Sequence, residues 1–286
     1  MASMKDIKRR RSSIQSTQQI TKAMKLVSTV KLQKAKTHAE NANPFFKHMF
    51  DTVTDILSLS TNISHPYLEG GRSDRAAVVV ITSNRGLAGG YNSNIVKMVM
   101  AQGFDKEKTD IYAIGGKGRD GLSLRGYKIK EDFSEVMEAP TYADAKKICD
   151  VILKSFLDGE IGEIYLAYAH FKNTVVNVPT MLKLLPVEFD EAEETDGKIM
   201  AAPMVYEPDE EEVLDLVIPK YVTSLFYGAL VEALASENGA RMQAMDSATS
   251  NAEEMIDDLS LKYNRARQGA ITQELTEIIA GAAAIS

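Results

Sequence analysis

Two glycine-rich segments of this 286-residue chain have the composition of phosphate-binding turns. Arg85-Gly-Leu-Ala-Gly-Gly90 lies between a predicted strand and a predicted helix, where backbone N–H groups at a helix start can hold a phosphate. Its glycines lack the spacing of the dinucleotide fingerprint, and Gly115-Gly-Lys-Gly118 is not a complete P-loop. Nucleotide binding at these turns is therefore a hypothesis that the spacing disfavours.

The other residue types that commonly carry chemistry are scattered. The four histidines are far apart in the sequence, and no clustered acid and base suggests hydrolysis; they are His38, His48, His65 and His170. Cys149, the single cysteine, cannot form an internal disulfide or a thiolate metal cage, and it is interpreted as a small helix residue. We expect no catalytic residue, no cofactor and no metal site in this chain.

The charge is distributed unevenly along the chain. The whole sequence has a formal net charge of -7, yet residues 1–50 contain eleven Lys and Arg against two acidic residues. A basic segment on an acidic protein indicates an anionic partner, which is a nucleic acid, a lipid headgroup or an acidic protein surface. Composition does not choose among the three.

No segment of the sequence is predicted to cross a membrane. The longest apolar runs, 76–81 and 278–285, are far shorter than the roughly 20 residues that a bilayer requires. The basic residues near the amino terminus are not followed by the apolar block of a secretory signal. We therefore expect the chain to remain in the cytoplasm.

The first part of the chain predicts one long helix, from about Met4 to Leu59, because it has apolar residues at helical spacing and little Gly or Pro. Pro44 predicts a kink. The predicted apolar stripe before it contains Ile7, Ile14, Ile20, Ala23, Val27 and Val30, with Met24 beside it. The stripe after it contains Phe46, Met49, Phe50, Val53, Ile56 and Leu57.

The middle of the chain predicts a small α/β domain after a connection at 65–75. Ala76-Ala-Val-Val-Val-Ile-Thr82 has the β-branched composition of a strand buried on both faces. Predicted helices and strands alternate after it, which favours a mostly parallel sheet. The predicted helices are 93–102 and 142–157, the predicted strands are 110–114, 127–133, 163–171 and 174–185, and a turn is predicted at 115–118.

The last part of the chain predicts a second long helix. An acidic loop or hairpin at 188–196 precedes Glu207-Pro-Asp-Glu-Glu-Glu212, which is typical of a helix start. Pro219 is expected to bend or delay the helix. The predicted seam contains Met245, Ala248, Ala252, Met255, Leu259 and Tyr263. Two four-residue steps in succession predict local unwinding there, and Ile271, Leu275, Ile278 and Ala282 resume the stripe in a new phase.

Neither terminal stripe can be buried by its own helix, so we expect the two helices to pair antiparallel around the inserted domain. The predicted fold class is α/β: a long antiparallel coiled coil of residues 1–60 and 208–286, with an α/β domain at 61–207. The alternative is two ordinary helices packed on the sheet. Helices that project beyond their own domain need a large partner to cover their sides.

Three segments resemble the gamma subunits of bacterial F-type ATP synthases. They are Ile20-Thr-Lys-Ala-Met24, Ser83-Asn-Arg-Gly-Leu-Ala-Gly-Gly-Tyr-Asn92, and the 23 residues from Tyr263 to Ile285. They occur in the order of that family, and the match extends over the whole chain. Members often have Cys where this chain has Ala88, and the cysteine pair of the redox-regulated plant versions is absent.

The resemblance implies a non-catalytic rotor shaft. In that family the paired helices lie inside a ring of three alpha and three beta subunits, and the α/β domain contacts epsilon and the membrane ring of c subunits. Rotation of the shaft links proton or sodium flow to ATP synthesis at sites on other subunits. The implied location is peripheral, on the cytoplasmic face of the cell membrane, and the implied partners include no nucleic acid.

The resemblance also assigns partner-binding residues. By their position in the family motifs, these residues contact the alpha/beta ring: Lys22, Met24, Lys25, Arg241, Gln243, Arg267, Gln268 and Thr272. Basic side chains attract an acidic lever without one fixed geometry, which suits a contact made repeatedly during rotation. The family implies a small apolar bearing tip at Ala282, Ala283, Ala284 and Ile285.

Two alternative interpretations remain open beside the rotor-shaft hypothesis. The basic amino-terminal helix is also consistent with a protein that binds nucleic acid or a membrane surface, with a nucleotide-binding α/β domain. A residue with charge or an amide on an exposed helix face is also consistent with simple solvation.

Overall fold

The computed structural model describes residues 4–59, 65–187 and 210–283. Within the long helices it does not describe the side chains at 40–43, 45–47, 50, 51, 54–59, 210 and 211. The chain forms two compact units, one of residues 29–240 and one that combines residues 1–28 with 241–286. The boundary between the two units falls within each long helix. The predicted domain limits at 60/61 and 207/208 follow the ends of the helices instead, and they stay a prediction.

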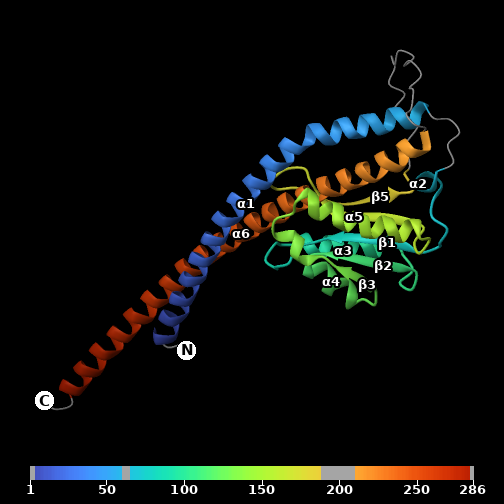
Figure 1. The fold of residues 1–286 in the computed structure, drawn as a ribbon. Helices are drawn as coiled ribbons and strands as arrows, with labels where there is room; N and C mark the ends of the chain where they lie inside the picture. The colour runs from blue at the N-terminus through green and yellow to red at the C-terminus, as the bar shows by residue number, and fades with distance from the viewer. Residues whose placement is uncertain (1–3, 60–64, 188–209, 284–286) are drawn as a thin grey trace. The chain divides into compact units, whose positions relative to one another are not determined.

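The chain has two long helices at its ends and short elements between them (Figure 1). The terminal helices are α1 (Met4–Leu59) and α6 (Glu210–Ala283). The helices between them are α2 (Pro66–Glu69), α3 (Tyr91–Ala101), α4 (Gly116–Ser123), η1 (Ser134–Glu138) and α5 (Tyr142–Leu157). The strands are β1 (Ala76–Ile81), β2 (Thr109–Ile114), β3 (Lys128–Asp132), β4 (Glu163–Phe171) and β5 (Asn177–Leu185).

The five strands form one mixed sheet in the order β3-β2-β1-β4-β5. Strands β3, β2, β1 and β4 run parallel, and β5 pairs antiparallel with β4. The predicted small domain with a mostly parallel sheet is therefore confirmed. The central strand β1 is apolar throughout because helices cover both faces of the sheet.

Helices cover the sheet on both sides, and alternate residues of β1 face opposite layers. Val78 and Val80 pack with α3 and α4, whereas Val79 and Ile81 pack with α5 and the amino-terminal half of α6 (Figure 1). The part of α6 in this second layer contributes Leu214, Ile218, Phe226, Leu230 and Ala233. The alternative of helices packed on the sheet is thus correct for this half of α6.

The predicted turn at 115–118 is only partly correct, because α4 begins at Gly116. Gly115 has φ of 109°, and a Cβ added there would lie 2.0 Å from the Thr82 carbonyl oxygen. The Gly118 amide donates to Thr82 Oγ1 at 2.7 Å. The glycines therefore allow the start of α4 to approach the end of β1 closely.

In the other unit, α1 and α6 form the predicted antiparallel pair. Thr21 lies opposite Thr249 and Arg11 lies over Tyr263, so residue numbers fall along α6 as they rise along α1. Pro44 and Pro219 both lie within continuous helices. Antiparallel helices joined through an inserted domain are the observed fold.

The seam of α1 differs from the predicted stripe. Its buried and half-buried residues recur every seven positions as Ile7, Ile14, Thr21 and Ser28, with Arg11, Gln18 and Lys25 between them. Ile20, Ala23, Val27 and Val30 are exposed instead. Ile7 and Ile14 match the prediction, which failed after Ile14 because it followed apolar residues, whereas five of these seven seam residues are polar.

The seam of α6 is more regular than predicted. Its buried and half-buried positions include two seven-residue series, Met245, Ala252, Leu259 and Ala266, and Thr249, Ile256, Tyr263 and Ala270. Met255 is exposed, so the predicted unwinding is wrong. The resumed stripe at Ile271, Leu275, Ile278 and Ala282 is not part of this seam, because these side chains are exposed. A sustained seven-residue repeat matches left-handed coiled-coil packing.

One helix, α6, is long and apolar enough by length and composition to cross a membrane among the described residues. The apolar window of α6 has mean hydropathy 1.3, and half of it is buried within the protein. A core helix of a soluble domain meets the same criterion, so this property does not assign α6 to a membrane.

Candidate partner-binding surface

Polar side chains hold α1 and α6 together within their unit. Thr21 and Thr249 share a hydrogen bond of 2.8 Å between their hydroxyl oxygens. Lys25 Nζ donates to Asp246 Oδ1 at 2.5 Å, and the Arg11 guanidinium carbon lies 5.6 Å from the centre of the Tyr263 ring. These contacts fix the register of the pair, because each needs its two residues at the same level.

All of the predicted partner-binding residues lie in this helical unit. The exposed ones are Lys22, Gln243, Arg267, Gln268 and Thr272, and the half-buried ones are Met24, Lys25 and Arg241. They come from both helices, from segments more than 200 positions apart in sequence.

Lys25 was expected to be a cation that is available to an acidic group of a partner subunit, and the structure differs. Its ammonium group is paired with Asp246 across the helix pair, with both side chains partly exposed. A partly exposed pair of this kind is screened by solvent and contributes little to stability. Lys25 therefore positions the two helices, and Lys22 is the more exposed cation of this segment.

The carboxyl-terminal end of α6 is exposed on all sides. Every described residue from 271 to 283 is exposed, including the apolar side chains of Ile271, Leu275, Ile278 and Ile279. Thr272 donates to the carbonyl oxygen of Gln268 at 2.9 Å, so its hydroxyl is used within the helix. Of the predicted tip, Ala282 and Ala283 end α6, and Ala284 and Ile285 lie outside the described residues.

A second exposed apolar surface lies on α1. Ile20 and Val27 are 59% and 58% exposed, and Leu26 is exposed beside them. Sequence reasoning assigned Ile20 and Val27 to the seam and did not single out Leu26. The seven-residue repeat of Ile7, Ile14, Thr21 and Ser28 was the signal that identifies the true seam and leaves this face free.

Two backbone amides at or beside the glycine-rich turns are bonded within the protein. The Ser83 amide donates to Asn92 Oδ1 at 2.9 Å, and the Gly116 amide donates to Asn84 Oδ1 at 2.9 Å. Ligands of open α/β sheets bind beyond the carboxyl ends of the strands, where the strand order reverses. Here α6 occupies that region: Tyr91 Oη donates to the Ala233 carbonyl, and Ser236 Oγ donates to the Ala169 carbonyl.

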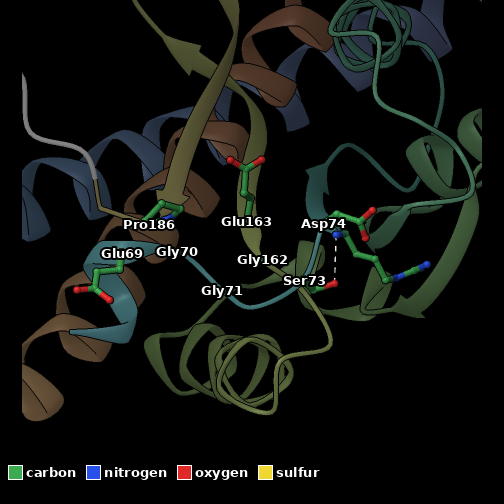
Figure 2. Close-up of a pocket in the computed structure, with 9 residues that line it drawn as sticks. Glu69, Gly70, Gly71, Ser73, Asp74, Gly162, Glu163 and Pro186 are labelled. Carbon is green, nitrogen blue, oxygen red and sulfur yellow. Dashed lines mark hydrogen bonds between the residues drawn. The ribbon is translucent and has the colours of Figure 1, made fainter. Parts of the chain in front are cut away.

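A polar hollow of about 350 Å³ lies at the opposite, amino-terminal edge of the sheet (Figure 2). Its three carboxylates, on Glu69, Asp74 and Glu163, point in different directions in Figure 2. Asp74 is paired with Lys108 at 2.5 Å, and Glu163 is paired with Lys183 at 3.1 Å. Two of the three acids are therefore paired with lysines, and the three do not form a converging ligand set.

Close backbone approach builds this hollow. The Gly71 amide donates to the Gly162 carbonyl at 3.0 Å, and the Gly162 amide donates to the Arg75 carbonyl at 2.7 Å. A Cβ on Gly162 would lie 1.9 Å from the Ser73 carbonyl oxygen, so a larger residue does not fit there. The glycines are explained by packing.

Cys149 and the histidines form no reactive cluster. No group of three or more potential metal-binding side chains occurs in the part of the chain that the structure describes. Burial raises the pKa of the Cys149 thiol to about 12, which keeps it protonated at neutral pH. The thiol is therefore a core group.

Comparison with known proteins gives a consistent result. The sequence model of a family described as ATP synthase matches residues 3–285. The chain is 64% identical to the ATP synthase gamma chain of Lachnoclostridium phytofermentans, covering 100% of both chains. It is 40% identical to a sodium ion specific ATP synthase gamma chain of Acetobacterium woodii, covering 99% of both.

The fold also matches a solved assembly. A chain in the OSCP/F1/c-ring structure of the Euglena gracilis mitochondrial ATP synthase superposes with a TM-score of 0.72 over 99% of this chain and 94% of that chain. Its sequence identity is 18%, so this likeness concerns the fold.

Proposed function

The chain belongs to the ATP synthase gamma-chain family, and we propose that it acts as the central-stalk rotor of an ion-translocating ATP synthase. In this role it transmits torque between a membrane ring and the subunits that make or hydrolyse ATP. The coupled ion is a proton or sodium. The chain carries no catalytic group of its own, and the ATP sites lie on partner subunits.

The observation that carries the proposal is the unused apolar surface of the helical unit. The seam between α1 and α6 buries polar residues such as Thr21 and Ser28, while Ile20, Leu26 and Val27 face outward. Exposed apolar surface of this kind usually marks an interaction site. A shaft enclosed by other subunits accounts for helices that keep apolar side chains on the outside.

The exposed end of α6 supports the same role. Leu275, Ile278 and Ile279 have no covering segment among the described residues. The ring of three alpha and three beta subunits would cover this end, with one gamma chain per ring. The small side chains of Ala282 and Ala283 suit a bearing, since they present little bulk to a rotating contact.

Specific contacts can be assigned on this basis. Arg267 and Gln268 would hydrogen-bond a loop of the ring, and Lys22 and Met24 would meet its moving acidic lever. Thr272, Arg241 and Gln243 lie on the same helical unit and would join these contacts. The α/β domain would contact epsilon and the c ring, and the protein would then lie peripherally on the cytoplasmic face of the cell membrane.

The arrangement disfavours the alternative of a basic helix binder with a nucleotide-binding domain. The amides of Ser83 and Gly116, at or beside the glycine-rich turns, are bonded to Asn92 and Asn84, and α6 fills the region beyond the carboxyl ends of the strands. Among the basic side chains, Arg11 and Lys25 are used within the helix pair.

Co-expression with alpha and beta subunits tests the proposal. We expect one gamma chain to co-purify with three alpha and three beta subunits and to rotate when a probe on the α/β domain is observed during ATP hydrolysis. A gamma chain that forms only homo-oligomers, and never captures the other two, would refute the shaft role.

A double variant tests the assigned contacts within the assembled complex. Arg267→Ala with Gln268→Ala should lower torque or turnover more than the yield of complex, because both side chains are exposed in the free chain. Lys97→Gln, on an exposed face of α3, is the control. Unchanged torque and turnover in the double variant would remove these two residues from the interface.

A further inference from the structure

A largely apolar hollow of about 440 Å³ lies in the unit of residues 29–240 and takes no part in the proposed shaft contacts. One wall is a face of α1, and the opposite wall is a face of α6. The segment 138–141, between η1 and α5, closes the space between them. A hollow of this volume is within the range of small-molecule sites in proteins, roughly 300–1,000 Å³.

The wall from α6 is apolar. Tyr227, Val231 and Leu234 are spaced four and three residues apart, so they lie on one face of the helix. Val231 is buried, and Tyr227 is held by an edge-to-face contact with Tyr142, with ring centres 5.8 Å apart. This wall would receive the apolar part of a ligand.

The wall from α1 carries positive charge. Lys31, Lys34 and His38 follow one another along the same helix face as the buried Ala35. No ion pair involving Lys31 or Lys34 is found among the residues that the structure describes. The one acidic residue of the lining, Glu138, is within 3.7 Å of the Arg85 guanidinium, which offsets its charge.

From this juxtaposition we propose that the hollow binds a small anionic amphiphile, such as a medium-chain carboxylate. The apolar chain lies against Tyr227, Val231 and Leu234, and the carboxylate accepts hydrogen bonds from the ammonium groups of Lys31 or Lys34. An apolar cavity with a few cationic groups at its edge combines area burial with a charge-assisted hydrogen bond. A neutral or a cationic amphiphile could fill the apolar part of the hollow, but it has no negative charge to pair with the lysines.

Binding at this place would join three elements of one unit. The ligand contacts α1, α6 and the segment that leads into α5, so it stabilises their arrangement by mass action. A bound small molecule would therefore make the contact between α1 and α6 in this unit more rigid. This inference stands on the hollow alone and is independent of the shaft assignment.

The test measures binding of octanoate to the full-length chain by calorimetry, with octanol and octylamine as probes of similar size. We expect saturable octanoate binding and a rise in the unfolding temperature with octanoate. Octanol should bind about tenfold more weakly, a difference of about 1.4 kcal/mol, because it has no carboxylate to accept a charge-assisted hydrogen bond from the lysines. Equal binding of octanol and octanoate would overturn the proposed role of the lysines.

Matched variants locate the site. Lys31→Gln with Lys34→Gln should weaken octanoate binding about tenfold. Lys97→Gln with Lys117→Gln removes the same charge from an exposed part of the same unit and should leave binding unchanged. Ala139→Phe fills the hollow from an exposed position and should abolish binding while circular dichroism stays unchanged.

The source of the ligand is tested with anionic phosphatidylglycerol vesicles. If the hollow binds a free amphiphile, the parent chain should bind octanoate in the absence of vesicles. Ala139→Phe should then associate with the vesicles to the same extent as the parent chain. Equal losses in the two lysine pairs, or association with vesicles alone, would reject the proposal.

Discussion

Cys149 is a reactive residue type that the fold makes inert. Its side chain is enclosed by β1, β4, α5 and α6, together with Val79, Ile164 and Phe226. Desolvation penalises the thiolate and raises the thiol pKa to about 12, although a hydrogen bond with Thr223 acts in the lowering direction. The residue therefore contributes packing and no nucleophile.

The thiol pKa predicts a pH dependence of stability. Because the folded pKa of about 12 lies above the ordinary value of 9.0, the thiol favours the folded chain below pH 9. This contribution falls as pH rises from 9 to 12, by up to about 1.4 kcal/mol per pH unit. Denaturant unfolding of Cys149→Ala should show a shallower decline over this interval than the parent chain.

Tyr168 provides the control, because burial raises its pKa to about 12 as well. Tyr168→Phe should remove the part of the stability loss at high pH that comes from Tyr168, and the part that comes from Cys149 should remain. Rapid labelling of Cys149 by a thiol reagent at pH 8, without denaturant, would contradict the burial of the thiol.

At the scale of elements, the helix pair is specified by a polar and apolar seven-residue repeat rather than by a continuous apolar stripe. Polar contacts such as Thr21 with Thr249 set the register, while apolar positions such as Met245, Ala252 and Leu259 exclude water. A helix pair held in this way has a small apolar core. Substitution of a single seam residue should therefore lower the free energy of unfolding measurably.

Two leucines on α6 test this seam. Leu259 is 8% exposed and Leu261 is 61% exposed. Leu259→Ala should lower the free energy of unfolding by about 2 kcal/mol and speed amide exchange in 252–266, because it opens a cavity between the helices. Leu261→Ala should change stability by less than about 0.5 kcal/mol. Equal effects of the two substitutions would reject the assigned seam.

At the scale of the whole molecule, α6 serves both compact units. Its amino-terminal half contributes Leu214, Phe226 and Ala233 to the core beneath the sheet, and its later part pairs with α1. Beyond Ala270 the same helix is exposed throughout. A single element thus takes part in a globular core and in a two-helix seam, and it ends in an exposed segment that we propose other chains cover.

The exposed end gives a prediction that rests on the shaft role. Leu275→Gln with Ile278→Gln should leave the stability of the free chain within about 0.5 kcal/mol, because both side chains are already in solvent. The same variant should weaken assembly with alpha and beta subunits in a co-purification assay. Glu274→Gln, on the same exposed segment, is the control. Normal assembly of the double variant would show that the apolar end contacts nothing.

Much of the fold could be predicted because its signals are local. The helix limits at Tyr142 and Leu157 match the prediction, and Thr141 with Asp144 forms the capping box that starts this helix. The strand limits at Glu163 and Phe171 match as well. Strand β5 begins later than predicted, since Asn173 Oδ1 accepts hydrogen bonds from the amides of Val175 and Val176 and forms a turn there.

The sequence by itself determined the two long helices, most of the strands, and the pairing of the two ends, because these signals are local or periodic. Only the tertiary structure decided which face of each helix is inside. Ile20 and Val27 were predicted to be buried and are exposed, whereas Thr21 and Ser28 are buried. Periodicity reports that a helix has an apolar face, but the element packed against it decides whether that face is covered by this chain or left for another.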